Sequence, residues 1–131
     1  MEVLSSRVVV AATDLARSRA FYEELLGLRV YREYGAGGHV LGVVYFLGGG
    51  HLELTAGRDL APAAVALWIQ VPHLAAEERR LAAAGATIVK PAATMPWGLR
   101  EMWIEGPDGV EIRLVEVPAD HPLRRRVEIS S

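Results

Sequence analysis

The stretch PWGLREMWIEGPDGVEIRLVE, residues 96–116, decides the fold that this sequence predicts. Two segments of alternating polarity flank residues 106–109, Gly-Pro-Asp-Gly. In that tetrapeptide the proline fixes φ, the aspartate can hydrogen-bond locally and the glycines permit positive φ. The stretch therefore predicts two strands joined by a tight turn.

The two predicted strands have one apolar face and one mixed face. Met102 and Ile104 share a side of the first strand, and Ile112 and Leu114 share a side of the second, because side chains alternate along a strand. These four residues are expected to face a core. The residues on the opposite side are Glu101, Trp103, Glu105, Glu111 and Arg113. A tryptophan among charges is unusual on a surface that binds nothing.

The composition limits the class of protein. The chain has 131 residues, 51% of them hydrophobic and 23% charged, which predicts one stable folded domain. A net charge of -2 argues against a general nucleic-acid surface. The sequence has no cysteine, so disulfides, thiolate metal sites and a cysteine nucleophile are excluded. No apolar run matches a membrane span or a signal peptide, so we expect a soluble, cytoplasmic protein without nucleic-acid or membrane partners.

The chain reads in order as two similar halves. In the first half, Thr13 or Asp14 can cap a helix that Gly27 ends. The predicted elements of this half are a strand at 7–12, a helix at 15–26, strands at 28–34, 40–47 and 51–55, and a glycine-rich loop at 35–38. The predicted elements of the second half are a strand at 65–71, a helix at 74–84, a strand at 86–90, a loop at 91–98 and the hairpin.

A duplicated βαβββ module explains this order most simply, since equivalent residues such as Glu53 and Arg113 recur at a nearly constant separation. We therefore expect an α+β fold in a single domain spanning residues 1–131. Its parts are module one at 5–56, a connector at 57–64, module two at 65–117 and a tail at 118–131. A basic cluster, Arg124 to Arg126, reads as part of a solvated tail.

Three stretches together resemble a known family. They are TDLARSRAFYEELLGLRV at 13–30, HLELTAG at 51–57 and the hairpin at 96–116. The chain is similar to the vicinal oxygen chelate superfamily, which includes glyoxalases, extradiol dioxygenases and bleomycin-resistance proteins. The Pro-Trp-Gly step, the Arg-Glu pair after it and the Gly-Pro-Asp-Gly turn look most like the bleomycin-resistance branch. The resemblance implies paired βαβββ modules with curved mixed sheets around a cleft, usually in a homodimer.

Metal-binding members of this family carry four ligands on the cleft-facing strands. By resemblance, those positions fall on Arg7, Glu53, Ala66 and Arg113. Of these only Glu53 can bind a metal, because arginine is a permanent cation and alanine has no ligand atom. We therefore expect no metal and no cofactor at these positions.

A displaced metal site remains open as an alternative. His51 and Glu53 lie at i and i+2, hence on one strand face, and His39 could approach from the neighbouring strand. Glu53 could instead pair with Arg113 across the cleft, with Arg7 joining them.

The cleft face supplies the candidate ligand-binding residues, chosen by strand alternation. They are Arg7, Tyr45, His51, Glu53, Trp68, Gln70, Trp97, Glu101, Trp103, Glu111 and Arg113. Tyr45 and Phe46 are adjacent, so only one can face the cleft, and Tyr45 is chosen. Trp97 reads either as a lid over a ligand or as a fixed packing anchor. Flat aromatic side chains beside charges fit a large, partly aromatic ligand.

The leading hypothesis is a non-catalytic protein that sequesters a bulky natural-product antibiotic, bleomycin-like or enediyne-like, for self-resistance. The rival is a glyoxalase-like isomerase, lyase or dioxygenase with a displaced or absent metal site, in which Glu53 acts as general base. A third hypothesis is a regulatory or carrier subunit that binds a partner protein through exposed strands.

Overall fold

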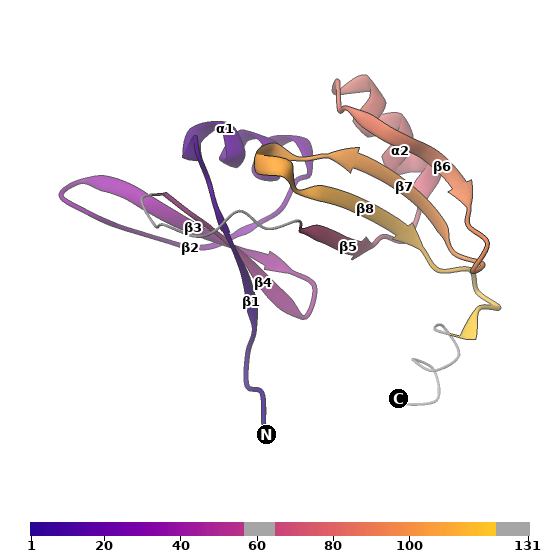
Figure 1. The fold of residues 1–131 in the computed structure, drawn as a ribbon, viewed down its shortest axis with the longest axis horizontal. Coiled ribbons are helices and arrows are strands. Elements are labelled where there is room, and N and C mark those ends of the chain that lie inside the picture. Colours follow the sequence, from indigo (N-terminus) through magenta and orange to yellow (C-terminus); the bar gives the residue numbers. More distant parts are fainter. Residues whose placement is uncertain (57–64, 123–131) are drawn as a thin grey trace. The chain divides into compact units, whose positions relative to one another are not determined.

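The computed structural model describes residues 1–56 and 65–122 (Figure 1). The chain divides into two compact units, Met1–Ala64 and Val65–Ser131, and each contains a four-stranded sheet. The predicted connector at 57–64 and the basic cluster Arg124 to Arg126 lie outside the described residues. No helix in the described ranges is long and apolar enough to span a membrane.

The first unit has the order β-α-β-β-β. Its elements are β1 (Arg7–Ala11), α1 (Leu15–Arg19), η1 (Ala20–Leu25), β2 (Val30–Ala36), β3 (His39–Leu47) and β4 (Gly50–Thr55). The sheet order is β1-β4-β3-β2, in which β1 runs parallel to β4 and the other pairs are antiparallel. The predicted single helix is present, although its second half, η1, is wound as a π-helix.

The second unit repeats this order. Its elements are β5 (Ala66–Gln70), α2 (Leu74–Ala83), β6 (Ile88–Thr94), β7 (Arg100–Glu105), the short 3-10 turn η2 (Pro107–Gly109) and β8 (Glu111–Glu116). The sheet order is β5-β8-β7-β6, again with only the first pair parallel. The predicted α+β fold built from two βαβββ modules with mixed sheets is confirmed.

The hairpin that organises the sequence forms as predicted. Trp103 pairs with Arg113 and Ile104 with Ile112 across β7 and β8. In the turn both Asp108 (φ 58°) and Gly109 (φ 76°) adopt positive φ, which glycine and aspartate tolerate better than most residues.

Two predicted loops are shorter than expected. The loop at 35–38 is wrong in part because β2 continues to Ala36, where Gly35 lies so close to the His39 carbonyl that a Cβ could not fit. The loop at 91–98 is wrong in part because β6 continues through Pro91 to Thr94. Proline is tolerated there because β6 is an edge strand and its pairing is irregular between Lys90 and Ala93.

Each sheet has one face covered by its own helix. In the first unit the fully buried residues on that side include Tyr22, Tyr45, Leu52 and Leu54. In the second unit α2 contacts β6, β7 and β8. The first residue of α2, Leu74, is buried, and its backbone N–H donates to the Glu116 carboxylate over 2.8 Å. The apolar face of each sheet is therefore the helix-covered face, which leaves the mixed face open.

A charged network fixes the helix of the first unit to its sheet. The Arg19 guanidinium donates to Glu23 (2.6 Å) and to Glu33 (2.9 Å), and the Tyr45 hydroxyl donates to Glu23 (2.8 Å). The hydrogen bonds from Arg19 and then Tyr45 lower the pKa of Glu23 from its ordinary 4.5, although burial opposes this shift. Burial and the bond to Glu23 raise the pKa of Tyr45.

This network predicts a loss of stability in acid. A carboxyl whose folded-state pKa is lowered contributes stability above its unfolded pKa, and this contribution is lost as the pH falls through the folded-state pKa. As the pH falls below 4.5, the free energy of unfolding of the wild type should therefore fall more than that of Glu23→Gln. Urea unfolding at a series of pH values measures this. Glu24→Gln, at an exposed neighbour, is the control and should follow the wild type; a Glu23→Gln curve parallel to the wild type would contradict the prediction.

Candidate functional site

The open face of the first sheet is centred on the buried carboxylate of Glu53, which is 6% exposed. One oxygen accepts from the Arg7 guanidinium at 2.7 Å and the other from the Tyr34 hydroxyl at 2.5 Å. Of the predicted group of Glu53, Arg113 and Arg7, the ion pair between Glu53 and Arg7 is present in the first unit, and Arg113 pairs with Glu111 in the second. Within the first unit, Arg7 on β1 and Tyr34 on β2 therefore approach Glu53 from opposite sides, and each donates to one of its oxygens.

Gly42 makes the Tyr34 contact possible. It pairs with Tyr34 across β2 and β3, and a Cβ at this position would overlap the Tyr34 ring. Because Gly42 has no side chain, the phenol ring lies flat over β3 and its hydroxyl reaches Glu53 on β4. The side chain of Tyr34 was not among the predicted site residues.

His51 lies on the open face within a cluster of three rings. Its imidazole stacks on Tyr31 with ring centroids 4.9 Å apart, and Phe46 packs against both rings. Tyr31 and Phe46 are each about half exposed. His51 is one of the predicted site residues, whereas Tyr31 and Phe46 are not.

The choice of Tyr45 over Phe46 for the open face is wrong. Tyr45 pairs with Leu52, is fully buried, and packs against Tyr22 on the helix side. Phe46 pairs with His51 and lies on the open face. The face on which Phe46 lies follows from the register between β3 and β4. The two-residue turn at 48–49 sets this register.

The displaced metal site does not assemble from the predicted residues. His51 is opposite Phe46 on β3, whereas His39 begins β3 seven residues away, which is roughly 23 Å along a strand. Glu53 is already paired with Arg7 and Tyr34. Among residues 1–56 and 65–122, no three His, Cys, Asp or Glu side chains are grouped as metal ligands.

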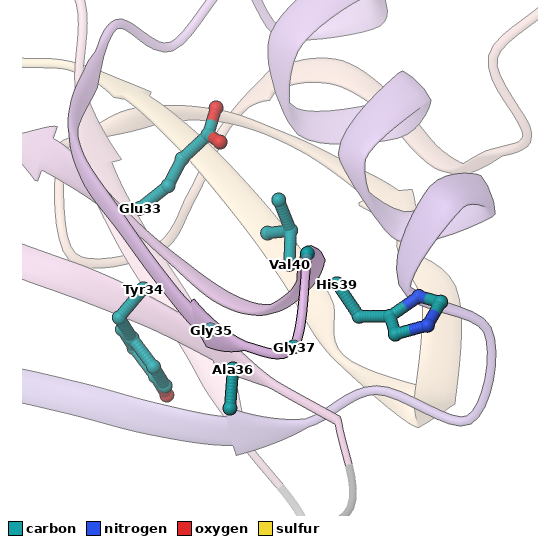
Figure 2. A pocket seen from close by; sticks show the side chains of 8 residues that line it. Glu33, Tyr34, Gly35, Ala36, Gly37, His39 and Val40 are labelled. Atoms are coloured by element: carbon teal, nitrogen blue, oxygen red, sulfur yellow. The ribbon is translucent and has the colours of Figure 1, made fainter.

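An open hollow of about 370 Å³ lies at the tip of the β2–β3 hairpin, lined by residues 33–40 (Figure 2). Figure 2 shows Tyr34 and Ala36 pointing to one side of the hairpin and Glu33 and Val40 to the other, as strand alternation requires. Residues 33–40 of one hairpin alone line this hollow, and apart from Glu33, Tyr34 and His39 they are small or apolar. The candidate site is therefore the open faces of the sheets and not this hollow.

The open face of the second sheet is centred on a second buried carboxylate. Glu101 is 3% exposed, and its two oxygens accept from two indole N–H groups. The Trp97 indole donates over 2.7 Å and the Trp103 indole over 2.9 Å. Three of the predicted ligand-binding residues are therefore in direct contact with one another.

Two cations lie over the ring of Trp103. The guanidinium carbon of Arg113 is 4.3 Å from its centroid and the Lys90 ammonium is 5.2 Å away. They come from the strands on either side of β7, because Trp103 pairs with both residues. Arg113 also forms an ion pair with Glu111 at 3.0 Å. Trp103 is therefore largely enclosed by charged neighbours.

The remaining predicted residues lie on β5. Trp68 pairs with Arg113, placing it on the same open face, and it is 49% exposed. Gln70 is exposed two residues further along that face. The open face of the second sheet thus brings together Trp68, Gln70, Glu101, Trp103, Glu111 and Arg113, with Trp97 joining through its hydrogen bond to Glu101.

The four positions where the family would place metal ligands do not fit a divalent metal. Glu53 is paired with Arg7, and Arg113 is paired with Glu111. Ala66 supplies no side-chain donor. Two guanidinium groups can neither coordinate a cation nor lose their charge at ordinary pH.

The comparisons with known proteins agree with this architecture. A family model described as Glyoxalase/Bleomycin resistance protein/Dioxygenase superfamily matches residues 5–114. No curated protein matches the sequence.

Several solved structures share the fold of this chain. TioX from Micromonospora sp. ML1 is 22% identical with a TM-score of 0.75, over 87% of this chain and 98% of that one. TnmS3, an antibiotic binding protein from Streptomyces sp. CB03234, is 19% identical with a TM-score of 0.71, over 89% and 98%. UcmS2 is 20% identical with a TM-score of 0.72, over 88% and 98%. At these identities the likeness establishes the shared fold.

The contact between Gly42 and Tyr34 predicts a steric effect. Gly42→Ala should lower the free energy of unfolding by about 1 to 3 kcal/mol, because the new methyl group displaces the ring that holds Glu53. In a Tyr34→Ala background, where the ring is gone, the same change should cost much less. Urea unfolding of the four proteins measures this coupling.

Gly49→Ala is the matched control, because a Cβ at that position meets no atom within 4 Å. Equal losses from Gly42→Ala in the two backgrounds would contradict the proposed contact.

Proposed function

This chain belongs to the Glyoxalase/Bleomycin resistance protein/Dioxygenase superfamily, and from that premise we propose that it binds a bulky, partly aromatic natural-product antibiotic and sequesters it unchanged. The antibiotic would be bleomycin-like or enediyne-like. Bound as an intact molecule, it would be kept from its target, so that the protein confers self-resistance.

The observation that carries the proposal is the open face of the second sheet. Two of its tryptophans, Trp68 and Trp97, are about half exposed, although such rings are usually buried. Lys90 and Arg113 lie close by, over the ring of Trp103. Exposed rings beside oriented charges suit a ligand that offers flat surfaces together with polar groups.

The hydrogen bonds of Glu53 support binding over catalysis. Glu53 is the only residue at the family's ligand positions that could act as a base, yet both its oxygens already accept hydrogen bonds, one of them from a guanidinium. Glu53 is also only 6% exposed, so little of its carboxylate is accessible to a substrate. The rival hypothesis of an enzyme that uses Glu53 therefore has the less favourable geometry.

The fold comparison adds support of a general kind. TnmS3, described as an antibiotic binding protein, shares the fold of this chain. Its function belongs to that protein, but it demonstrates that this architecture can hold an antibiotic. We further propose that the chain acts in the cytoplasm as a homodimer, as is common in the family, and that a second copy contributes to the binding cleft.

Antibiotic titration tests the proposal. Metal-free bleomycin, an enediyne chromophore and the planar anthracycline daunorubicin should be added while tryptophan fluorescence is recorded. At least one should give a saturable change, and Trp68→Ala or Trp97→Ala should weaken its binding by about 1 to 4 kcal/mol, because each removes an exposed ring.

Tyr45→Phe is the matched control, because Tyr45 lies on the helix-covered face and its change should leave affinity unaltered. Chromatography of the recovered antibiotic should return the unmodified compound at every time point. A modified product, or no saturable change with any of the three, would count against sequestration.

A further inference from the structure

The buried carboxylate of Glu101 has an unusual pair of partners. Each of its oxygens accepts one indole N–H, at 2.7 Å from Trp97 and at 2.9 Å from Trp103. No cation forms an ion pair with it in the described part of the chain. A carboxylate that is 3% exposed needs such donors, because an unsatisfied buried charge is strongly unfavourable. The same two bonds fix the orientation of both indole rings.

The two indoles differ in what their ring faces can still contact. The ring of Trp103 has Arg113 and Lys90 over it and is partly buried. Trp97 is 55% exposed although its N–H edge is held by Glu101. Trp97 is therefore the ring of this pair that a flat molecule can stack on.

The backbone around Trp97 is also fixed. The Met95 N–H donates to the Leu99 carbonyl (2.8 Å), and the Gly98 N–H donates to the Met95 carbonyl (2.9 Å). Gly98 adopts φ 89°, which closes this turn and favours glycine. A ring that is fixed both at its backbone and at its N–H edge behaves as a plate and not as a moving lid.

We propose that Glu101 is a positioning residue, which holds Trp97 as a preorganised stacking plate for a planar aromatic part of the ligand. Glu101 itself does not contact the ligand, because its side chain is buried beneath the two indoles that it binds. The stacking role rests on the proposed antibiotic-binding function, whereas the hydrogen-bonded role of Glu101 can be tested without any ligand. Preorganisation favours binding because the ring need not be ordered when the ligand arrives.

Indole N–H resonances in the ligand-free protein test the hydrogen bonds. The chain has three tryptophans, so nitrogen-15 spectra should show three such signals. In Glu101→Ala the signals of Trp97 and Trp103 should move and their protons should exchange faster, while that of Trp68 stays in place. In Glu101→Gln only one of the two should be released, since a carboxamide keeps one acceptor oxygen.

Glu105→Gln is the matched control. It removes a carboxylate from the same face of β7, where Glu105 makes no indole hydrogen bond among the described residues, so all three signals should remain. If Glu101→Ala left the Trp97 and Trp103 signals unchanged, the positioning role would be overturned.

Titration with daunorubicin and with metal-free bleomycin tests the stacking role. Glu101→Ala should weaken binding by roughly 2- to 10-fold, the range expected for one aromatic contact. Trp97→Ala should weaken it at least as much, and the double variant should bind no more weakly than Trp97→Ala alone. Losses that multiply in the double variant would indicate that Glu101 acts independently of Trp97 and would overturn the proposal.

The two experiments separate the possible failures. If the wild type bound neither antibiotic, the stacking role would be overturned together with the proposed function for these compounds. The indole spectra would still decide whether Glu101 positions the two rings.

Discussion

A buried carboxylate on the open face of each sheet is the constraint on which the arrangement of side chains depends. Neither Glu53 nor Glu101 can remain charged and buried without donors. In the first unit the donors are a guanidinium and a phenol, and in the second they are two indoles. In the second unit one of the donors, Trp103, also has Arg113 and Lys90 over its ring.

The two units satisfy that constraint differently because the duplicated positions have diverged. Glu53 pairs with Val44 in the first sheet, and its counterpart Arg113 pairs with Trp103 in the second. Exchange of a carboxylate for a guanidinium removes a possible metal ligand and supplies a cation for an aromatic ring. One fold can thus carry different side-chain chemistry at equivalent positions of its two units.

This divergence bears on the kind of function that the scaffold can support. An arginine at a ligand position and an acid neutralised by its neighbours leave little for hydrolytic or redox metal chemistry. Exposed rings held by hydrogen bonds favour recognition through shape and stacking, in which rigidity contributes to affinity. In such a site the binding free energy is more favourable because the rings are already ordered before the ligand binds.

The sequence by itself determined the order of elements, the duplicated module, the hairpin at 96–116 and the face on which most candidate residues lie. These follow from local rules, because alternation and turn residues act within a few positions along the chain. It failed where the outcome depended on contacts between strands. Tyr45 and Phe46 could be assigned to their faces only once the β3–β4 register was known.

Only the tertiary structure decided how the side chains of separate strands engage one another. Glycine at position 42 lets Tyr34 reach Glu53, and Lys90 meets Trp103 because the two residues pair across β6 and β7. The bond of Glu101 to the Trp97 indole depends on a loop whose conformation Gly98 sets. Such contacts arise from packing in three dimensions, which the pattern of a single sequence does not encode.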